Sequence, residues 1–438
     1  MKFLKNLGLF LLTVVVLAAW VMLPWQGALA LLLLLALWLF LFRGGAQARS
    51  VASVGISTLN QRIGSSAVIV VGIAGVVGVL VALLAMAEGY AQTLRNSGGL
   101  DTAIVLRGAS AAEVASALSR EDIVQISQAA GIARNDKGDP LVSAETVVAA
   151  NLPVKGTKTD EEGSAQVRGV GDEAFAVRPH LKIVEGRRFQ PGLRELVVGK
   201  GAVRQFEGLS VGATLKLGNQ PWTVAGIFAS GDAMESELWA DANVVNDAYQ
   251  RGSGRNSATV KLTSADAFKG FKDALAANPQ LKVDANTTLD FFAKQSEKMT
   301  QMLRIIGITV GAIMAVGAVF GALNTMFAAI ASRAREIATL RAIGFRGLPV
   351  VVAVMLETML LALIGGAIGG LVAWLLFNGF EASTMAAGSV GKLSFSLRVS
   401  PGLLWEGVKW ALAIGFIGGL FPAVRAASLP VTTALREL

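Results

Sequence analysis

The sequence predicts an α-helical membrane protein with six transmembrane helices and one α+β extracytoplasmic domain. The first observation is composition: 53% of the 438 residues are hydrophobic and 16% are charged, whereas soluble proteins are about a quarter charged. The second is a set of six apolar runs, each near the ~20 residues that span hydrocarbon. The third is the stretch 89–300, which has the composition of an ordinary soluble domain.

Two apolar runs open the chain, and residues 1–43 are predicted to form a transmembrane hairpin. The runs are residues 4–23 and 27–42, separated by a Pro-Trp-Gln-Gly turn. A cleaved signal peptide is the alternative for the first run, but its length and the immediate second run favour the hairpin. Residues 44–65 carry arginines and no acid, and they are predicted to form an amphipathic segment on the cytoplasmic membrane surface.

Four further apolar runs are predicted to form core spans, over residues 66–88, 289–332, 350–377 and 402–424. The second of these has no helix breaker, and at ~1.5 Å per residue it would be about 66 Å long. That is twice the ~30 Å hydrocarbon core, so part of it is predicted to project as a stalk. Small residues let helices approach closely. Those assigned to helix packing are Gly72, Gly75, Gly78, Gly317, Gly321, Gly365, Gly369, Gly415 and Gly419.

Residues 89–300 are predicted to form the α+β domain, because strands and helices mix there without a regular repeat. We expect a membrane-proximal lobe from residues 89–150 and 256–288, and an inserted lobe from residues 151–255. The predicted strands are Thr102–Arg107, Val142–Ala150, Glu195–Val198, Thr214–Leu217, Trp222–Phe228, Ala258–Leu262 and Leu281–Val283, and the predicted helices are Ala111–Leu118, Asp122–Ala129, Gly201–Phe206 and Ala265–Ala277.

Basic residues set the predicted topology. Residues 89–300 have a net charge of −1, and the rest of the chain has +9. Because cytoplasmic loops carry the excess of Lys and Arg, both termini and the tail 425–438 are predicted inside, and the large domain and a loop at 378–401 outside. This describes a multi-pass membrane protein, surrounded by lipid, whose large domain lies outside, which is the periplasm if the cell has an outer membrane. Nucleic-acid binding is not expected, because no basic stripe with interleaved aromatics occurs.

Residues 333–349 are predicted to contain a short amphipathic helix that docks on a cytoplasmic partner. Apolar residues repeat at helical spacing, and a glycine can end the helix in a left-handed cap. Charges would orient the partner, and Ile337 and Leu340 would supply apolar contact. The alternative is that the charges only set topology. The residues assigned to this coupling segment are Arg333, Arg335, Glu336, Ile337, Leu340, Arg341 and Gly344.

Two polar residues lie inside predicted spans. Glu357 lies about two turns into its span, where an acid is costly and suggests a functional site by default. Pairing with Arg341 or Arg346 at the cytoplasmic boundary is favoured over a proton or substrate role. Asn324 is predicted to hydrogen-bond between helices.

No catalytic or metal site is predicted on this chain. Cysteine is absent, and the single histidine, His180, is expected in a solvated loop. Asp232, Glu235, Glu237 and Asp241 lack the glycine turn and terminal glutamate of a calcium loop. They are expected on a solvated or partner-binding surface.

Several stretches resemble a known family. NTMFAAIASRAREIATLRAIGFRG followed by VMLETMLLALIGGAIGGLVAWLL looks like the permease signature of the MacB/FtsX superfamily, the type VII ABC transporters. FPAVRAASLPVTTALREL is similar to the closing motif of that family, and VGISTLNQRIGSSAVIVVGIAGVVGVLVAL resembles its first conserved helix. RELVVGKGAVRQFEGLSVGATLKLGNQPWTVAGIF looks like the MacB-type periplasmic core domain.

The resemblance implies a four-helix core, with the hairpin at residues 1–43 as an addition. It also implies an ATPase, yet no G-x-x-x-x-G-K-[ST] phosphate loop is present. We therefore expect no cofactor on this chain, with ATP and magnesium on a separate ABC ATPase dimer. The other expected partners are a second permease and a periplasmic adaptor. The implied task is export, and lipoprotein release or signalling to a periplasmic hydrolase or sensor are the alternatives.

Overall fold

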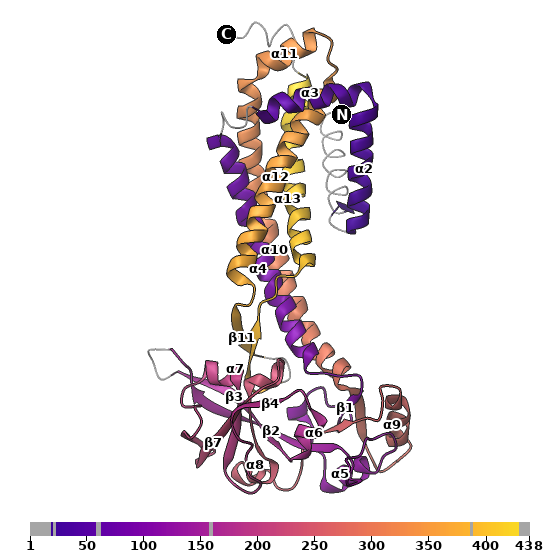
Figure 1. The fold of residues 1–438 in the computed structure, drawn as a ribbon, viewed down its shortest axis with the longest axis vertical. Helices are drawn as coiled ribbons and strands as arrows, with labels where there is room; N and C mark the ends of the chain where they lie inside the picture. Colours follow the sequence, from indigo (N-terminus) through magenta and orange to yellow (C-terminus); the bar gives the residue numbers. More distant parts are fainter. Residues whose placement is uncertain (1–18, 21–22, 58–62, 157–160, 386–388, 429–438) are drawn as a thin grey trace. The chain divides into compact units, whose positions relative to one another are not determined.

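The chain divides into two compact units in the computed structural model, which describes residues 19–20, 23–57, 63–156, 161–385 and 389–428 (Figure 1). The helical unit comprises Met1–Ala85, Leu303–Asn378 and Arg398–Leu438. The sheet unit comprises Met86–Met302 and Gly379–Leu397. The chain therefore passes from one unit to the other four times.

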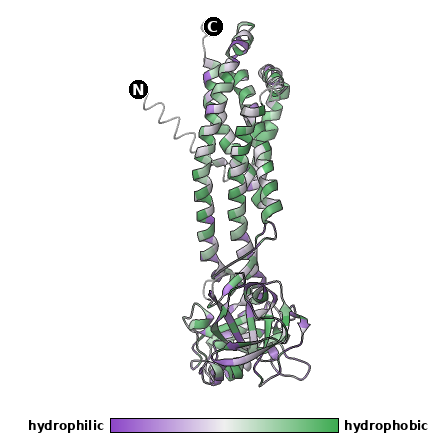
Figure 2. Cartoon of the chain, turned by 90° about the vertical axis from the view of Figure 1, so that its left-hand side faces the viewer, coloured by the Kyte–Doolittle hydropathy of each residue, from purple (hydrophilic) through white to green (hydrophobic). Residues whose placement is uncertain are grey.

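Four helices are long and apolar enough to cross a membrane: α4 (Ile63–Asn96), α10 (Thr288–Ser332), α12 (Gly347–Phe377) and α13 (Pro401–Ser428). They correspond to the four predicted core spans, and most of their residues are coloured as hydrophobic in Figure 2. The helix predicted over residues 289–332 is present as α10, without a break.

The predicted count of six spans is not confirmed by the described residues. α2 (Trp25–Leu41) covers the second run of the predicted hairpin, but α3 (Arg43–Ser57) leaves it at an angle of 96°, so the pair adds at most one span. The bend occurs at Phe42, whose backbone is extended. The first run, residues 4–23, lies almost wholly outside the described residues. In the part of the chain that the structure describes, four helices, or five segments with the bent pair, can cross a membrane.

α3 covers the predicted amphipathic segment and packs against α12. Its buried residues are all small, Gly45, Ala48, Ala52 and Gly55, and they recur at helical spacing. The opposite face exposes Arg43 and Arg49 with several serines. A small-residue face lets α3 lie close to its neighbour, so this helix is held by contact with the chain itself.

Four of the glycines assigned to helix packing lie at close contacts between helices. A Cβ on Gly365 would lie 2.8 Å from the carbonyl oxygen of Val70, and one on Gly369 would lie 2.4 Å from that of Ala74. α4 and α12 therefore approach as closely as their backbones allow. Between α12 and α13, a Cβ on Gly415 would lie 2.5 Å from Ala362, and Gly419 meets Thr358 in the same way.

The other predicted packing glycines do not serve this purpose within the chain. Gly78 has only an ordinary contact at 3.6 Å, and no atom lies within 4 Å of a Cβ placed on Gly72, Gly75, Gly317 or Gly321. The last four positions have no neighbouring helix beside them, since each helix buries only one side. The close approach of α10 to α4 instead occurs at Gly307 and Gly311, which meet Leu83 and Leu80.

The sheet unit is built on one mixed sheet of ten strands, in the order β10-β1-β9-β2-β3-β8-β5-β7-β4 with β6 paired to β7. Neighbouring strands are antiparallel except for the pairs β3–β8 and β5–β7. The strands are β1 (Thr102–Arg107), β2 (Val142–Pro153), β3 (Glu162–Val170), β4 (Lys182–Gly186), β5 (Glu195–Gly199), β6 (Thr214–Leu217), β7 (Gln220–Ala229), β8 (Glu237–Asp241), β9 (Ser257–Lys261) and β10 (Val283–Thr287).

Short helices connect the strands, and they are α5 (Arg120–Ser127), α6 (Glu173–Val177), α7 (Lys200–Gln205), α8 (Ala242–Ala248) and α9 (Ala267–Ala276), with 3-10 turns η2 (Glu113–Ala115) and η3 (Ala233–Ser236). The predicted helix over Ala111–Leu118 is wrong, because only η2 forms there. Strands β3, β4 and β8 were not predicted. β8 is buried on both faces and its sequence lacks the alternation that indicates a strand, whereas polar and apolar residues do alternate in β3.

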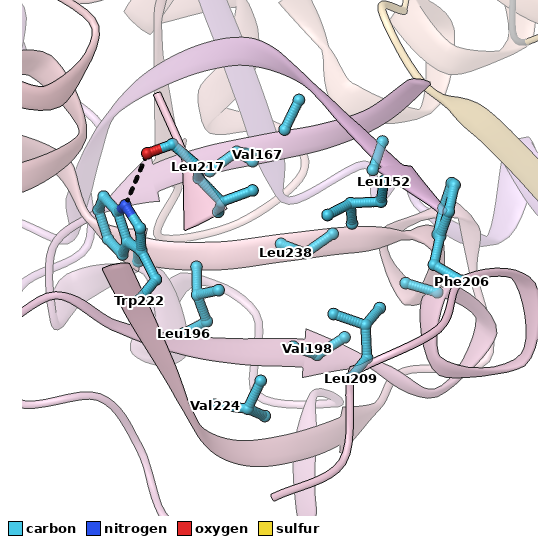
Figure 3. Packing of buried hydrophobic residues seen from close by; sticks show 14 of the residues in the cluster. Leu152, Val167, Leu196, Val198, Phe206, Leu209, Leu217, Trp222, Val224 and Leu238 are labelled. Atoms are coloured by element: carbon cyan, nitrogen blue, oxygen red, sulfur yellow. Dashed lines mark hydrogen bonds between the residues drawn. The ribbon is translucent and has the colours of Figure 1, made fainter. Parts of the chain in front are cut away.

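Two hydrophobic clusters lie in the sheet unit. The larger, around Trp222, is shown in Figure 3, where the indole nitrogen donates to the carbonyl oxygen of Leu217 at 3.2 Å. The smaller surrounds Phe271, from α9, and Leu118. Strand β2 contributes Val142 to the smaller cluster and Val148 to the larger one. A shared strand therefore joins the two cores near the predicted lobe boundary at residue 150, and the lobe boundaries themselves stay a prediction.

The predicted loop at residues 378–401 is a β-hairpin in the structure. Its strands are β11 (Glu381–Met385) and β12 (Lys392–Ser396), and they pair antiparallel. Leu393 and Phe395 alternate with polar residues and are each 3% exposed. These two strands were not predicted, because the two-residue alternation is too short to stand out from the sequence.

Candidate functional site

The predicted docking helix forms as α11 (Ala334–Ala342), which begins after Arg333. It ends at Gly344, which has a left-handed backbone with φ of 107°, as predicted. The amide of Gly344 donates to the carbonyl oxygen of Arg341, and that of Phe345 to Leu340, each at 3.1 Å. These bonds satisfy carbonyls at the helix end and fix the direction in which the chain leaves it.

α11 presents one polar face with an apolar end. Arg335, Glu336 and Thr339 are exposed, and Ile343 is 71% exposed at the end of the helix. Arg341 and Leu340 are half-buried. Ile337 is only 7% exposed, so its predicted role as an apolar contact for a partner is wrong. The reason is rotational: Ile337 lies on the side of α11 that packs on the chain itself, whereas Ile343 does not.

A buried ion pair anchors the beginning of α11. Arg333 donates from Nη1 to Oε2 of Glu357 in α12 at 2.9 Å and from Nη2 to the carbonyl oxygen of Gly55 in α3 at 3.1 Å. The acid therefore pairs with Arg333, and the expected partners Arg341 and Arg346 were wrong. Arg333 follows the last residue of α10, and this places it beside α12, whereas the later arginines lie beyond the turn of α11.

A glycine makes this three-helix contact possible. A Cβ on Gly55 would lie 2.8 Å from Oε2 of Glu357. The carbonyl oxygen of Gly55 can then accept from Arg333 while the carboxylate lies directly against α3. One guanidinium thus joins α3, α10 and α12 at the point where α11 begins.

Asn324 lies on an exposed face of α10. The same face includes Ile313 and Phe320, which are 69% and 67% exposed, and the open Gly317 and Gly321. Among the described residues, the side chain of Asn324 has no hydrogen-bond partner, so the predicted bond between helices is not found within this chain.

The sheet unit contains a buried charge cluster that sequence reasoning missed. Arg168 in β3 is 1% exposed and donates to three glutamates from three other elements. Its bonds run from Nε to Glu237 at 2.7 Å, from Nη1 to Glu145 at 2.7 Å, and from Nη1 to Glu113 at 2.8 Å. Glu113 comes from η2, Glu145 from β2 and Glu237 from β8. The cluster therefore joins four separate parts of the sheet unit.

A second arginine completes the cluster. Arg178, just after α6, donates to both carboxylate oxygens of Glu145, at 2.6 and 3.0 Å. Burial by itself raises the pKa of Glu145, but the charges of Arg178 and Arg168 outweigh burial and hold the pKa at about 2, against an ordinary 4.5. Glu145 is therefore a carboxylate at every physiological pH. The carboxylates all accept from arginine, an arrangement that suits a structural clamp.

Sequence alone gave no clear signal for this cluster. Ser164, Gln166 and Arg168 alternate with apolar or small residues, a pattern typical of a strand with one solvated face, whereas the structure buries Gln166 and Arg168. The three partners of Arg168 are spread from residue 113 to residue 237, so no spacing connects them.

The acids considered for a metal have structural roles. Glu237 belongs to the charge cluster, and Asp241 caps α8 by accepting from the amides of Asn243 and Val244. Asp232 caps η3 and also bonds Nε2 of His180 at 3.0 Å. Glu235 accepts from the amides of Ser230 and Gly231. These carboxylates are directed to different partners instead of toward a shared centre.

Two family models match the chain. The MacB-like periplasmic core domain matches residues 66–278, and the FtsX-like permease C-terminal domain matches residues 308–431. The chain belongs to the MacB/FtsX family of ABC transporter permeases. It is accordingly a multi-pass membrane protein with a periplasmic-type domain. Neither matching domain is an ATPase.

Curated relatives of this permease are macrolide export ATP-binding/permease proteins named MacB. The protein from Photorhabdus laumondii is 25% identical over 63% of this chain and 44% of its own length. Those from Paracoccus denitrificans and Shigella boydii are each 26% identical, over 84% and 89% of this chain and 55% and 60% of their own lengths. The chain spans about half the length of these relatives.

Two solved structures are similar to part of the chain. One is the extracellular domain of the noncanonic ABC-type transporter YknZ from Gram-positive bacteria, at 19% identity and a TM-score of 0.33, over 42% of this chain and 100% of that one. The other is the periplasmic region of MacB from Actinobacillus actinomycetemcomitans, at 18% identity and a TM-score of 0.33, over 47% of this chain and 94% of that one.

Replacing Arg168 tests the charge cluster. Arg168→Met leaves three buried carboxylates without their shared donor, and removing one partner of a buried ion pair costs on the order of 3–5 kcal/mol. We expect thermal unfolding of the sheet unit at a clearly lower temperature, measured by circular dichroism on the purified full chain. Arg187→Met is the matched control, because Arg187 pairs with Glu195 at the surface, where ion pairs contribute little. Equal melting temperatures for both variants would contradict the assignment.

The low pKa of Glu145 predicts loss of stability in acid. Because the folded pKa is about 2 and the unfolded one is near 4.5, the carboxylate stabilises the fold fully above pH ~4.5 and progressively less toward pH 2. The shift corresponds to something on the order of 3 kcal/mol. Melting temperatures between pH 7 and pH 2 should fall steeply in the wild type. In Glu145→Gln they should start lower and change less, and parallel curves would be inconsistent with this role.

Proposed function

We propose that this permease is the transmembrane subunit of an ATP-driven ABC transporter. A separate ATPase dimer, carrying ATP and magnesium, binds on the cytoplasmic side and drives a conformational change in the periplasmic unit. Family membership supports the permease role, and the absence of an ATPase among its matching domains supports a separate energy source. The basic excess of the segments between spans supports placement in a bacterial inner membrane.

The observation that carries this proposal is the anchored start of α11. The Arg333–Glu357 pair attaches the junction between α10 and α11 to α12. A force on α11 therefore acts on α10 and α12 together. α10 runs without a break from this junction to Thr288, which directly follows β10 of the sheet unit. A continuous helix transmits displacement along its axis. α11 is then the receiving end of a lever, and the sheet unit is what the lever moves.

The exposed face of α11 fits a partner that contacts its charged side chains and one apolar residue. Arg335 and Glu336 present opposite charges that favour one orientation of the partner, and Ile343 supplies apolar area next to them. An exposed isoleucine at the end of a rigid helix can fill a small pocket at the centre of an interface.

Export is the task we propose for the periplasmic side, with a periplasmic adaptor as the next component. The name of the similar MacB proteins, macrolide export ATP-binding/permease protein, supports this choice. Lipoprotein release and signalling to a periplasmic hydrolase or sensor use the same scaffold, and the proteins that co-purify distinguish them. A co-purified ATPase with an adaptor supports export, an ATPase with a hydrolase supports signalling, and a complex without any ATPase overturns the proposal.

A second permease is the partner we propose for the exposed face of α10. A neutral amide facing hydrocarbon lacks hydrogen bonds, and two copies related by a two-fold axis supply them to each other through Asn324. Gly317 and Gly321, which have open space beside them, let the second helix approach. Lipid covers the remaining apolar surface of the spans.

Substitution of Ile343 tests docking. Ile343→Asp places a charge in the proposed apolar contact, and we expect at least a ten-fold weaker association with the ATPase, or about 1.4 kcal/mol. Association is measured by co-purification from the native host at native expression levels. Ile343→Val keeps the contact and is the control that should bind normally. An Ile343→Asp protein that retains its ATPase and its melting temperature would refute the docking role.

The face of α10 is tested by cysteine cross-linking, because the natural chain has no cysteine. Asn324→Cys should form a disulfide-linked dimer on mild oxidation in membranes, seen on a non-reducing gel. Ala322→Cys, on the buried side of the same helix at 1% exposure, should remain a monomer. Equal yields from both positions, or a monomer in both, would contradict pairing through this face.

A further inference from the structure

The connection between α12 and α13 is more than a link between two spans. Helices in bundles are joined by about 2–8 residues, whereas Phe377 and Pro401 are separated by a paired hairpin. Gly379–Leu397 belongs to the sheet unit, although the helices on either side belong to the helical unit. The chain thus leaves the helical unit, docks in the sheet unit and returns.

The hairpin is held by both polar and apolar contacts. The amide of Ser394 donates to Oγ of Ser236 in η3 at 2.8 Å, and Oγ of Ser164 in β3 donates to the carbonyl oxygen of Val390. The ring of Phe395 packs edge-on against Tyr90, with centroids 5.6 Å apart, and both residues are buried.

Backbone contact with β3 is equally close. A Cβ on Gly391 would lie 2.5 Å from the amide nitrogen of Gln166. Only glycine leaves room for β3 and the hairpin at this distance. The hairpin is therefore fitted to the sheet unit along its backbone as well as through side chains.

Gln166 connects the hairpin to the buried charge cluster. Its Nε2 donates to Oε1 of Glu237 at 2.6 Å, and its Oε1 accepts from Oγ of Ser389 at 2.7 Å. The orientation of the Gln166 side-chain amide follows from its neighbours: the carboxylate of Glu237 can only accept, so the NH2 group must face it. Glu237 in turn binds Arg168, so one chain of hydrogen bonds runs from the hairpin to the clamp that joins β2, β3 and β8.

We propose that the β11–β12 hairpin is a second coupling element, which stays docked and carries movement of α12 and α13 to the sheet unit. Gln166 is its positioning residue. α10 is then one of two routes by which the sheet unit is driven. This inference rests on the proposed function for what drives the movement, whereas docking of the hairpin stands on its own contacts.

The first experiment locks the hairpin in place. In the cysteine-free chain, Ser236→Cys with Ser394→Cys places two thiols where the structure has a hydrogen bond. We expect a cross-link within the full-length protein by a short bis-thiol reagent, with no change in the response to ATP. Failure to cross-link overturns the docking. A cross-link that abolishes the response also overturns the proposal, because the hairpin would then have to detach during the cycle.

The second experiment weakens the connection. Gln166→Glu is nearly isosteric but directs a carboxylate at Glu237 and cannot donate to it. In the complex with the co-purified ATPase, hydrogen exchange of residues 86–302 is measured with and without ATP. We expect the ATP-dependent change to fall at least two-fold, while ATP hydrolysis continues. Ser389→Ala, which removes only the hairpin hydroxyl, should act in the same direction if Gln166→Glu fails to fold.

The control is Gln280→Glu, the same change at an exposed position, which should respond as the wild type does. A wild-type response in both Gln166→Glu and Ser389→Ala overturns the coupling role and leaves the proposed function intact. A wild-type complex that binds its ATPase and shows no change with ATP overturns the proposed function, and this inference with it.

Discussion

The sheet unit depends on one buried guanidinium. Arg168 lies at 1% exposure in the middle of a strand, and a charge in that position is tolerable only if carboxylates surround it. The need for those partners draws η2, β2 and β8 together, and Glu145 then recruits Arg178 from the end of α6. Apolar burial in the two hydrophobic cores is non-directional, whereas the hydrogen bonds of the charge cluster require particular donor and acceptor positions.

The helical unit is held by contacts of another kind. Its four long helices are mostly apolar, so burial of apolar area does not select one packing in a membrane. Close backbone approach selects it instead, at Gly365 and Gly369 against α4 and at Gly415 and Gly419 against α13. One buried ion pair, Arg333 with Glu357, lies at the junction of α10 and α11. This pair joins the start of α11 to α12.

Two elements connect the proposed coupling surface on α11 with the sheet unit: the continuous helix α10 and the hairpin between α12 and α13. α10 has no break between the Arg333 anchor and β10, and the hairpin between α12 and α13 reaches the charge cluster through Gln166. Under the proposed function, α10 and the hairpin are the two routes for a movement imposed at α11. The charge cluster is where the second route ends.

The sequence by itself determined the membrane class, the four core spans, most strands of the sheet unit, and the helix and left-handed cap of the coupling segment. These follow from hydropathy, from periodicity and from the position of a glycine at a helix end, which are all local features of the sequence. Only the tertiary structure decided that Glu357 pairs with Arg333, that Ile343 instead of Ile337 is exposed, that residues 378–401 hold a docked hairpin, and that Arg168 collects three glutamates. Each of these depends on which face an element turns to its neighbour, or on partners far apart in the chain, and no local pattern records either.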